Sequence, residues 1–301
     1  MIAPELSVIV AFHNMAREAP RTLFTLSTGF QRGVSAADYE VLAVDVGSTE
    51  PLDPDAVAAF GPHFRLLRAP AAPSPAAAMN HAAQEARGGA IAVCIDGARM
   101  LSPGVIRLLI AGLRAFRDPV VATLAWHLGP KVQNESMLDG YDRESEDRLL
   151  ASVDWRGDGY ELFRISALAG SSASGWFRPI GESNCLAVSR AAWDALGGLD
   201  ERFQAAGGGL VNLDFYRQAC DRASDLVLLL GEGTFHQFHG GVATNVPRDR
   251  HPFETFHAEY IAIRGGPFAA PTREAVFLGR VPPQAFPFLA HSVAAAIELA
   301  G

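Results

Sequence analysis

The stretch Leu6-Ser-Val-Ile-Val-Ala-Phe-His-Asn14 stands near the start of the chain. It is apolar except for Ser7 until it reaches the polar pair His13-Asn14. A continuous apolar run of this length is typical of a parallel strand that helices cover on both faces. The stretch therefore predicts an α/β fold in which a polar loop follows a buried strand.

Two later stretches repeat this pattern. The apolar residues Val41–Val44 lead into Asp45, and the apolar residues Ala90–Ile95 lead into Asp96. In an open parallel sheet, the loops at the carboxyl ends of the strands form the ligand crevice. We therefore expect Asn14, Asp45 and Asp96 to line one site.

The composition and charge exclude several classes of protein. Of the 301 residues, 49% are hydrophobic and 19% are charged, which is ordinary for a globular protein and excludes a disordered or fibrous chain. The formal net charge is −8 and the basic residues form no run, so the basic patch of a nucleic-acid-binding protein is missing. We expect no nucleic-acid partner.

Cysteine usage and hydropathy indicate a compartment. Cys94, Cys185 and Cys220 lie far apart without paired ligand spacing, which favours free thiols in a reducing compartment. The chain has neither a basic signal region at its start nor an apolar run of about 20 residues. We expect a cytoplasmic protein with no integral membrane segment, either free or held at the periphery of the inner membrane by a partner.

The order of the predicted elements suggests a division of the chain. Residues 1–245 are expected to form one domain, with a nucleotide-binding half at 1–128 and an acceptor-binding half at 129–245. The second half opens with a long polar and aromatic segment, and such connections are usually binding segments or lids. Residues 246–301 are expected to form a C-terminal helical extension.

Five pieces of the sequence occur in the order and spacing of a known family. They are Ser7–Asn14, Val44–Thr49, Asn80 with its alanine-rich surroundings, Ile95–Ala98 and Gly197–Phe203. In these pieces the chain resembles the family 2 glycosyltransferases of the GT-A fold, which move a sugar from a nucleotide donor to an acceptor hydroxyl. The resemblance covers roughly residues 6–240. It implies a mostly parallel central sheet with helices on both faces, followed here by a C-terminal helical arm.

The resemblance implies a nucleoside-binding group. By it, Ala11, His13, Asn14 and Asp45 hold uridine or another nucleoside, and Asn80 lies at the donor site. A carboxylate suits this task because it accepts hydrogen bonds from base or ribose donors. The alternative for Asp45 is that it caps the turn after its strand.

A second group concerns the diphosphate. Asp96 takes the first position of the family's metal-binding Asp-x-Asp motif, but Ala98 takes the last and Arg99 follows. The departing diphosphate needs a hard divalent cation or a fixed cation beside it. His236 and His239 fall where related enzymes place a histidine, so Asp96 with one of them would bind Mn²⁺ or Mg²⁺. Alternatively, Arg99 replaces the metal, and the cation is then dispensable.

The catalytic base is the least defined residue. Inverting members use a carboxylate at a position that Asn212 occupies here, and asparagine is not a useful proton acceptor. Asp214 is the nearest carboxylate, although it could instead be a helix residue paired with an arginine. Glu182 is a rival base. Asp200 and Glu201 are further rivals for the base.

The aromatic segment offers platforms for an acceptor sugar. Trp155 and Trp176 are the candidates, and core packing is the competing interpretation for both. The glycines Gly207–Gly209 would form either a lid over the donor or a plain turn. The Ala-rich helix Ala290–Ala300 would mediate a homodimer, bind the acceptor or close the core.

Together these features predict an inverting, hexosyl-type glycosyltransferase with a UDP-sugar donor. Its acceptor would be a glycan, a lipid-linked sugar or a protein. A second hypothesis is a catalytically impaired nucleotide-sugar binding module of the same fold, because Ala98 and Asn212 replace two expected carboxylates. A third is a nucleotidyltransferase, which the lack of a glycine- and arginine-rich N-terminal loop disfavours.

Overall fold

The computed structural model describes residues 3–298, and within them ten strands form one sheet. The strands are β1 (Leu6–Phe12), β2 (Tyr39–Val46), β3 (Phe64–Ala69), β4 (Ala90–Cys94), β5 (Arg99–Leu101), β6 (Val120–Leu128), β7 (Ser166–Leu168), β8 (Leu186–Ser189), β9 (Leu226–His236) and β10 (Ala275–Gly279). The α-helices are α1 (Ala19–Thr25), α2 (Pro54–Ala58), α3 (Ala76–Glu85), α4 (Val105–Ala115), α5 (Gln133–Ser136), α6 (Arg143–Ala151), α7 (Arg190–Leu196), α8 (Val211–Arg222), α9 (Phe253–Arg264) and α10 (Phe286–Glu298).

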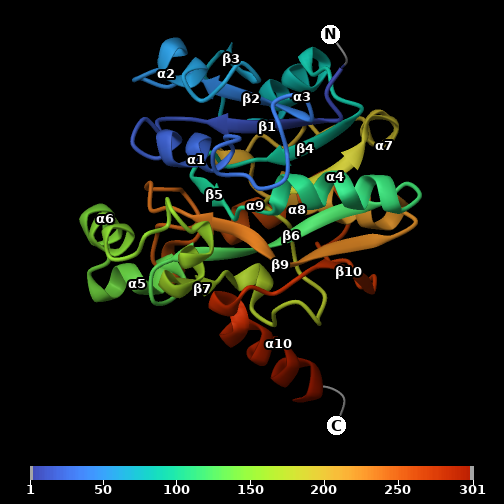
Figure 1. The fold of residues 1–301 in the computed structure, drawn as a ribbon. Coiled ribbons are helices and arrows are strands. Elements are labelled where there is room, and N and C mark those ends of the chain that lie inside the picture. The colour runs from blue at the N-terminus through green and yellow to red at the C-terminus, as the bar shows by residue number, and fades with distance from the viewer. Residues whose placement is uncertain (1–2, 299–301) are drawn as a thin grey trace.

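The sheet is mixed but mostly parallel. Its order is β10-β9-β6-β8-β4-β1-β2-β3, with β5 beside β9 and β7 beside β6. The pairs β1–β2, β1–β4, β2–β3, β6–β9 and β9–β10 are parallel, whereas β8 runs antiparallel to both β4 and β6. Helices flank the sheet (Figure 1), and the predicted fold class is confirmed.

The side chains of β1 alternate between two apolar cores, one on each face of the sheet. Val8 packs in the core that contains Leu23 of α1 and Ile106 of α4. Ile9 packs in the core that contains Met79 of α3. All seven residues of β1 are buried, because both faces are covered, and this explains the continuous apolar run in the sequence.

The position of β1 between two parallel strands determines which edge of the sheet can bind a ligand. Its neighbours on the two sides are β2 and β4, both parallel to it, so the loops after these three strands meet at one edge of the sheet. Asn14 and Asp96 lie in two of these loops, and Asp45 is the penultimate residue of β2 at the same edge. The common placement predicted for the three loops follows from this strand order.

The segment between β6 and β8 is built from short helices and the strand β7. Trp155 is 6% exposed and Trp176 is 1% exposed, and both belong to the apolar core. The indole nitrogen of Trp176 donates to the carbonyl oxygen of Leu229 at 3.1 Å. The proposal that these tryptophans form open sugar platforms is therefore wrong, and the core-packing interpretation holds.

The tail contains a strand that the sequence analysis missed. β10 pairs in parallel with β9, so residues after 246 contribute to the central sheet as well as forming helices. The helix α10 projects from the sheet at the end of the described chain (Figure 1). Residues 299 and 300 of the expected terminal helix lie outside the described residues. The division of the chain at residue 245 stays a prediction.

Within residues 3–298, no helix has both the length and the apolar character needed to cross a bilayer.

Candidate donor and metal site

Asp96 lies in a tight loop between β4 and β5. Its Oδ1 accepts a hydrogen bond from the backbone N–H of Ala98 at 2.9 Å. A Cβ atom at Gly97 would lie 2.6 Å from the carbonyl oxygen of Ala11 and would also meet the ring of Phe12. Glycine is therefore required here, because the loop passes directly against the end of β1.

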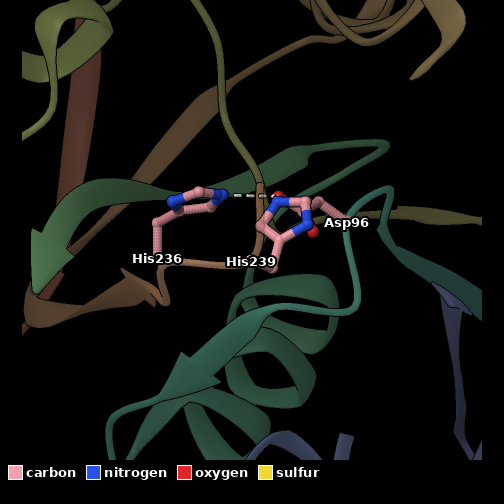
Figure 2. A group of neighbouring side chains, drawn as sticks. All are labelled: Asp96, His236 and His239. Carbon is pink, nitrogen blue, oxygen red and sulfur yellow. Dashed lines mark ion pairs between the residues drawn. The ribbon is translucent and has the colours of Figure 1, made fainter. Parts of the chain in front are cut away.

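Two histidines reach Asp96 from the other side of the site. His236 is the last residue of β9, and His239 follows three residues later. The Nε2 atoms of His236 and His239 lie 2.9 Å and 3.7 Å from Asp96 Oδ2. One ligand atom from each of the three residues lies within 4.8 Å of the others (Figure 2). The structure thus brings together all three residues predicted to bind a metal.

The hydrogen bonds of Gln133 determine which ring nitrogen of His236 carries the proton. The Gln133 Nε2 group donates to the carbonyl oxygen of His236 at 2.9 Å, which turns Oε1 toward the ring. Oε1 lies 2.8 Å from His236 Nδ1 and also accepts from the amide of Asn245 at 2.9 Å. An amide oxygen only accepts, so Nδ1 carries the proton and Nε2 presents a lone pair.

This arrangement fits a bound cation. The lone pair of His236 Nε2 faces a carboxylate oxygen of Asp96 at 2.9 Å, and buried His236 Nε2 has no hydrogen-bond donor. Two acceptors at this distance repel each other unless a proton or a metal ion lies between or beside them. A histidine whose other nitrogen donates to a fixed oxygen is a common metal ligand.

The protonation states agree with this interpretation. Burial lowers the pKa of His236 to about 4, so the ring is neutral at pH 7. Burial alone would raise the pKa of Asp96, but His239, His236 and Arg99 hold it well below its usual range. The site therefore offers an ionised carboxylate and a neutral imidazole, which are the forms that bind a divalent cation.

Arg99 contributes a buried positive charge to the same site. It lies opposite His236 in the β5–β9 pair, and its Nε is 3.7 Å from Asp96 Oδ2. The residue is 5% exposed, and its Nε and Nη1 have no hydrogen-bond partner among the described residues. Unpaired guanidinium N–H groups are suited to phosphate oxygens, so the two predicted cation sources, a metal and Arg99, occupy one site.

The loop that carries His239 is held by Arg17, which lies just before α1, and by charged residues of α6. Glu146 accepts a hydrogen bond from the backbone N–H of Phe238 at 2.5 Å, and Arg17 donates to the carbonyl oxygen of Phe238 at 3.3 Å. Arg143 donates to the carbonyl oxygen of His239 at 2.9 Å. Burial raises the pKa of Glu146 to about 7, against the lowering effect of Phe238 N–H and the nearby arginines. The loop is thus positioned by the polar segment between β6 and β8.

The loop after β1 meets the loop after β2. His13 Nδ1 lies 2.7 Å from the carbonyl oxygen of Val46, and Asn14 adopts a left-handed conformation with φ 53°. Asn14 Oδ1 accepts from the backbone and the hydroxyl of Thr49 at 2.8 and 2.9 Å. His13 and Asn14 are exposed, whereas Ala11 is buried at the end of β1. His13 and Asn14 therefore remain candidates for nucleoside contacts.

Two residues expected at the donor, Asp45 and Asn80, have hydrogen-bond partners within the protein, and their role at the donor stays a prediction. Asp45 is 2% exposed, and its two oxygens accept from the backbone N–H groups of Ser48 and Leu52 at 3.1 and 2.7 Å. This geometry supports the turn-cap interpretation of Asp45. Asn80 is bonded through its amide to both backbone groups of Leu199 and to Glu201. These hydrogen bonds link α3 to the Gly197–Phe203 segment.

The two base candidates have different surroundings. Asp214 is 1% exposed, and Arg264 donates to its oxygens at 2.7 and 2.5 Å. It is therefore the arginine-paired residue that the sequence left as an alternative. Glu182 is only partly buried, and its Oε2 accepts from the side-chain amide of Asn212 at 2.9 Å. Asn212, which by the family resemblance takes the position of the base in inverting enzymes, thus orients the carboxylate of Glu182, which comes from another segment.

Sequence reasoning missed several residues of this site. Gln133 and Asn245 fix the orientation of His236 and of the loop after it. His127 lies beside His236 with ring centres 5.2 Å apart, and its Nδ1 accepts from Gln133 N–H. All three lie in or beside segments without periodicity or a recognisable motif. The signals that pointed to this site were the motif at Asp96 and the pair of histidines flanked by glycines, and neither of them indicates Gln133, Asn245 or His127.

A mostly parallel α/β sheet with a carboxylate–imidazole site at the ends of its strands is the arrangement expected of a GT-A glycosyltransferase. The family model described as Glycosyl transferase family 2 matches residues 7–161, which is more than half of the chain. The chain therefore belongs to this family, and it is a glycosyltransferase of the class that uses nucleotide-sugar donors.

Solved structures show a similar fold at low sequence identity. Residues 1–349 of Staphylococcus aureus TarS superpose with a TM-score of 0.53 at 13% identity, over 98% of this chain and 72% of that one. A longer TarS structure gives 0.50 at 14% identity, over 78% and 37%. The mannosyltransferase PcManGT from Pyrobaculum calidifontis, in complex with GDP-Man and Mn²⁺, gives 0.49 at 18% identity, over 100% and 75%. Comparison with curated proteins found no match.

Proposed function

We propose that this glycosyltransferase moves a hexosyl group from a UDP-sugar to an acceptor hydroxyl with inversion at the anomeric carbon. The observation that carries the proposal is the convergence of Asp96, His236, His239 and Arg99 at the edge of the sheet beside the loop of His13 and Asn14. This edge is where open α/β sheets bind nucleotides.

Asp96, His236 and His239 are proposed to hold Mn²⁺ or Mg²⁺. A divalent cation held there would neutralise the negative charge that develops on the departing diphosphate. Arg99 is proposed to add a fixed charge to the same oxygens, since its buried Nε and Nη1 make no hydrogen bond to any described residue, and Nε forms only a long ion pair with Asp96. These four residues would thereby stabilise the diphosphate as it leaves the sugar.

Glu182 is proposed to accept the proton of the attacking hydroxyl. The residue is only partly buried, and the Asn212 amide donates to one of its carboxylate oxygens, which orients the carboxylate without neutralising it. The other oxygen is left to receive a proton from the acceptor. A positioned carboxylate of this kind contributes about 10²–10⁴-fold to the rate.

The acceptor is proposed to be a glycan, a lipid-linked sugar or a protein, and the protein is proposed to act as a soluble or peripheral cytoplasmic enzyme. The donor test is incubation with a panel of UDP-sugars and GDP-mannose, with released nucleoside diphosphate as the readout. Turnover with a UDP-sugar that stops in EDTA and returns with Mn²⁺ supports the proposal. Full activity in EDTA would show that no metal is needed and that Arg99 alone neutralises the charge of the departing diphosphate.

The base assignment has its own test. Glu182→Gln keeps the size and the Asn212 contact but removes the proton acceptor, so the rate of transfer should fall about 10²–10⁴-fold while UDP binding is unchanged. A variant with wild-type transfer rates would contradict the assignment. Binding of UDP by the wild-type protein without transfer from any donor would favour the impaired binding module instead.

A further inference from the structure

A cavity of about 620 Å³ lies where α5 approaches the start of α9. Its size is within the range of small-molecule binding sites. The residues that line it and enter the argument are Asn134, Asp249, His251, Phe253, Glu254 and Thr255. None of them belongs to the site described above.

Phe253 gives this cavity an exposed aromatic surface. The side chain is 50% exposed, although it is among the largest apolar groups of the chain. Its ring stacks on His257 with centres 5.3 Å apart and an interplanar angle of 17°. The stacking orients the ring, a second and tilted ring contact comes from His251 at 6.4 Å between centres, and half of the side chain remains exposed. An exposed aromatic face fixed at a cavity is suited to the C–H face of a pyranose ring.

Polar groups surround the aromatic ring. Asp249 and Glu254 supply carboxylate acceptors, Asn134 supplies both an acceptor and a donor, and Thr255 supplies a hydroxyl. A sugar has one apolar C–H face and a rim of hydroxyl groups. The cavity presents the complementary pattern, with one apolar face and several hydrogen-bonding groups around it.

Two segments that line the cavity also carry residues that contact the metal-site histidines. Asn134 directly follows Gln133, whose side chain contacts both the ring and the backbone of His236. Asn245 contacts Gln133 and also the backbone of the loop that carries His239, and the chain then runs on to Asp249. A ligand in the cavity would therefore lie beside the segment that carries the donor-site histidines.

The charge of the lining restricts the ligand. Asp249 and Glu254 are acidic, and the one basic group among the lining residues is His251. Burial lowers the pKa of His251 from its ordinary value, so this ring does not offset the two carboxylates at neutral pH. A phosphate or other anionic group would be repelled by this lining.

We infer that the Phe253 cavity is the acceptor subsite and that it binds an uncharged sugar ring, not a phosphorylated one. This inference rests on the proposed transfer function, because it names the class of acceptor for that reaction. Phe253 would be a binding residue that sets the position of the acceptor, and it would take no part in holding the donor.

The test is saturation-transfer-difference NMR with methyl β-glucopyranoside, methyl N-acetyl-β-glucosaminide, methyl α-mannopyranoside and glucose 6-phosphate as separate probes. The proteins are the full chain, Phe253→Ala, Phe253→Leu and Phe286→Ala. Phe286 is the matched control because it is 53% exposed and lies outside the cavity, on α10. Phe253→Leu keeps an apolar side chain and removes only the aromatic face, so its result does not depend on how the alanine variant folds.

We expect at least one neutral glycoside to give a signal with the wild-type protein, strongest at the ring C–H protons. Both Phe253 variants should reduce that signal at least about fivefold, Phe286→Ala should leave it unchanged, and glucose 6-phosphate should give none. Absence of any wild-type glycoside signal, an undiminished signal in the Phe253 variants, or equal binding of glucose 6-phosphate would overturn the inference.

Calorimetry with UDP and Mn²⁺ on the same samples separates this inference from the proposed function. UDP binding without a glycoside signal overturns the acceptor subsite alone. A Phe253-dependent glycoside signal without UDP binding overturns the donor proposal and leaves the sugar site standing. Unchanged UDP binding in Phe253→Leu is expected, since the ring of Phe253 contacts those of His251 and His257, and neither histidine belongs to the donor site.

Discussion

Replacing Asp214 by asparagine distinguishes a structural carboxylate from a catalytic one. Asp214 accepts two charge-assisted hydrogen bonds from Arg264, at 2.7 and 2.5 Å, and one from Gln218 at 2.6 Å. Breaking a fully buried ion pair costs about 3–5 kcal/mol. Arg264 is 25% exposed and, in the variant, would still form its ion pair with Asp200 at 2.8 Å, so we expect Asp214→Asn to lower the free energy of unfolding by only about 2 kcal/mol. Domains of this size lose about 2 °C in Tm per kcal/mol, which predicts a decrease of about 4 °C.

The assay pairs thermal unfolding with the rate of UDP release below the Tm of every variant. Asp214→Asn should lower the Tm and leave kcat within about twofold of wild type, since the residue touches neither Glu182 nor the metal-site group in the structure. Asp221→Asn is the matched control, because Asp221 is a 65% exposed carboxylate on the same helix and should change neither quantity. A variant of Asp214 with wild-type Tm and abolished turnover would refute the reasoning and make Asp214 the base.

Three further predictions concern the metal site and the loop that carries its histidines. Glu146 has a folded-state pKa raised to about 7 from 4.5, so its contribution to stability is complete below pH 4.5 and is lost as the pH rises through 7. The free energy of unfolding, measured with denaturant at pH 5 and 8, should show that Glu146→Gln removes about 3 kcal/mol of this pH dependence. The control Glu144→Gln, at an 86% exposed side chain of the same helix, should retain it. The same pH dependence in wild type and Glu146→Gln would contradict the raised pKa of Glu146. Gln133→Leu should weaken Mn²⁺ binding about 10–100-fold in a paramagnetic resonance titration, because the Nδ1–H of His236 loses its acceptor; unchanged affinity would count against the tautomer argument. Gly97→Ala should cost about 1–3 kcal/mol in urea unfolding and lower Mn²⁺ affinity with it, since the added methyl group meets Ala11 and Phe12; a neutral variant would show that the loop can move aside.

Much of the fold was predictable because both faces of the sheet are buried. The apolar run that starts at Leu6 predicts a strand over Leu6–Phe12, and the helical repeat of Val211–Arg222 predicts a helix; β1 and α8 have these limits. Prediction is poorer where a strand lacks such a pattern. The apolar run Leu226–Leu230 predicts a strand, but β9 continues to His236 because backbone pairing with β6 and β5 extends it past Gly231. β10 was missed because it is an edge strand with half-exposed residues.

The candidate site was predictable only in part. The family motifs indicated Asp96, Arg99, His236 and His239, and the structure brings these four together. The same motifs indicated Asp45, whose oxygens accept backbone N–H groups in the next turn. A short motif shows that a carboxylate follows a strand, but it does not show which donors surround the carboxylate after folding. That information depends on loop geometry.

By itself, the sequence determined the parallel sheet and the loops at its carboxyl edge, because burial on both faces forces continuous apolar strands and leaves polar residues for the strand ends. Only the tertiary structure decided what those polar residues do. The tautomer of His236 depends on Gln133, the orientation of Glu182 depends on Asn212, and the pairing of Asp214 depends on Arg264. Each pair is separated by at least 30 residues in the chain, and hydrogen bonds depend on distance and direction in space, which no local pattern encodes.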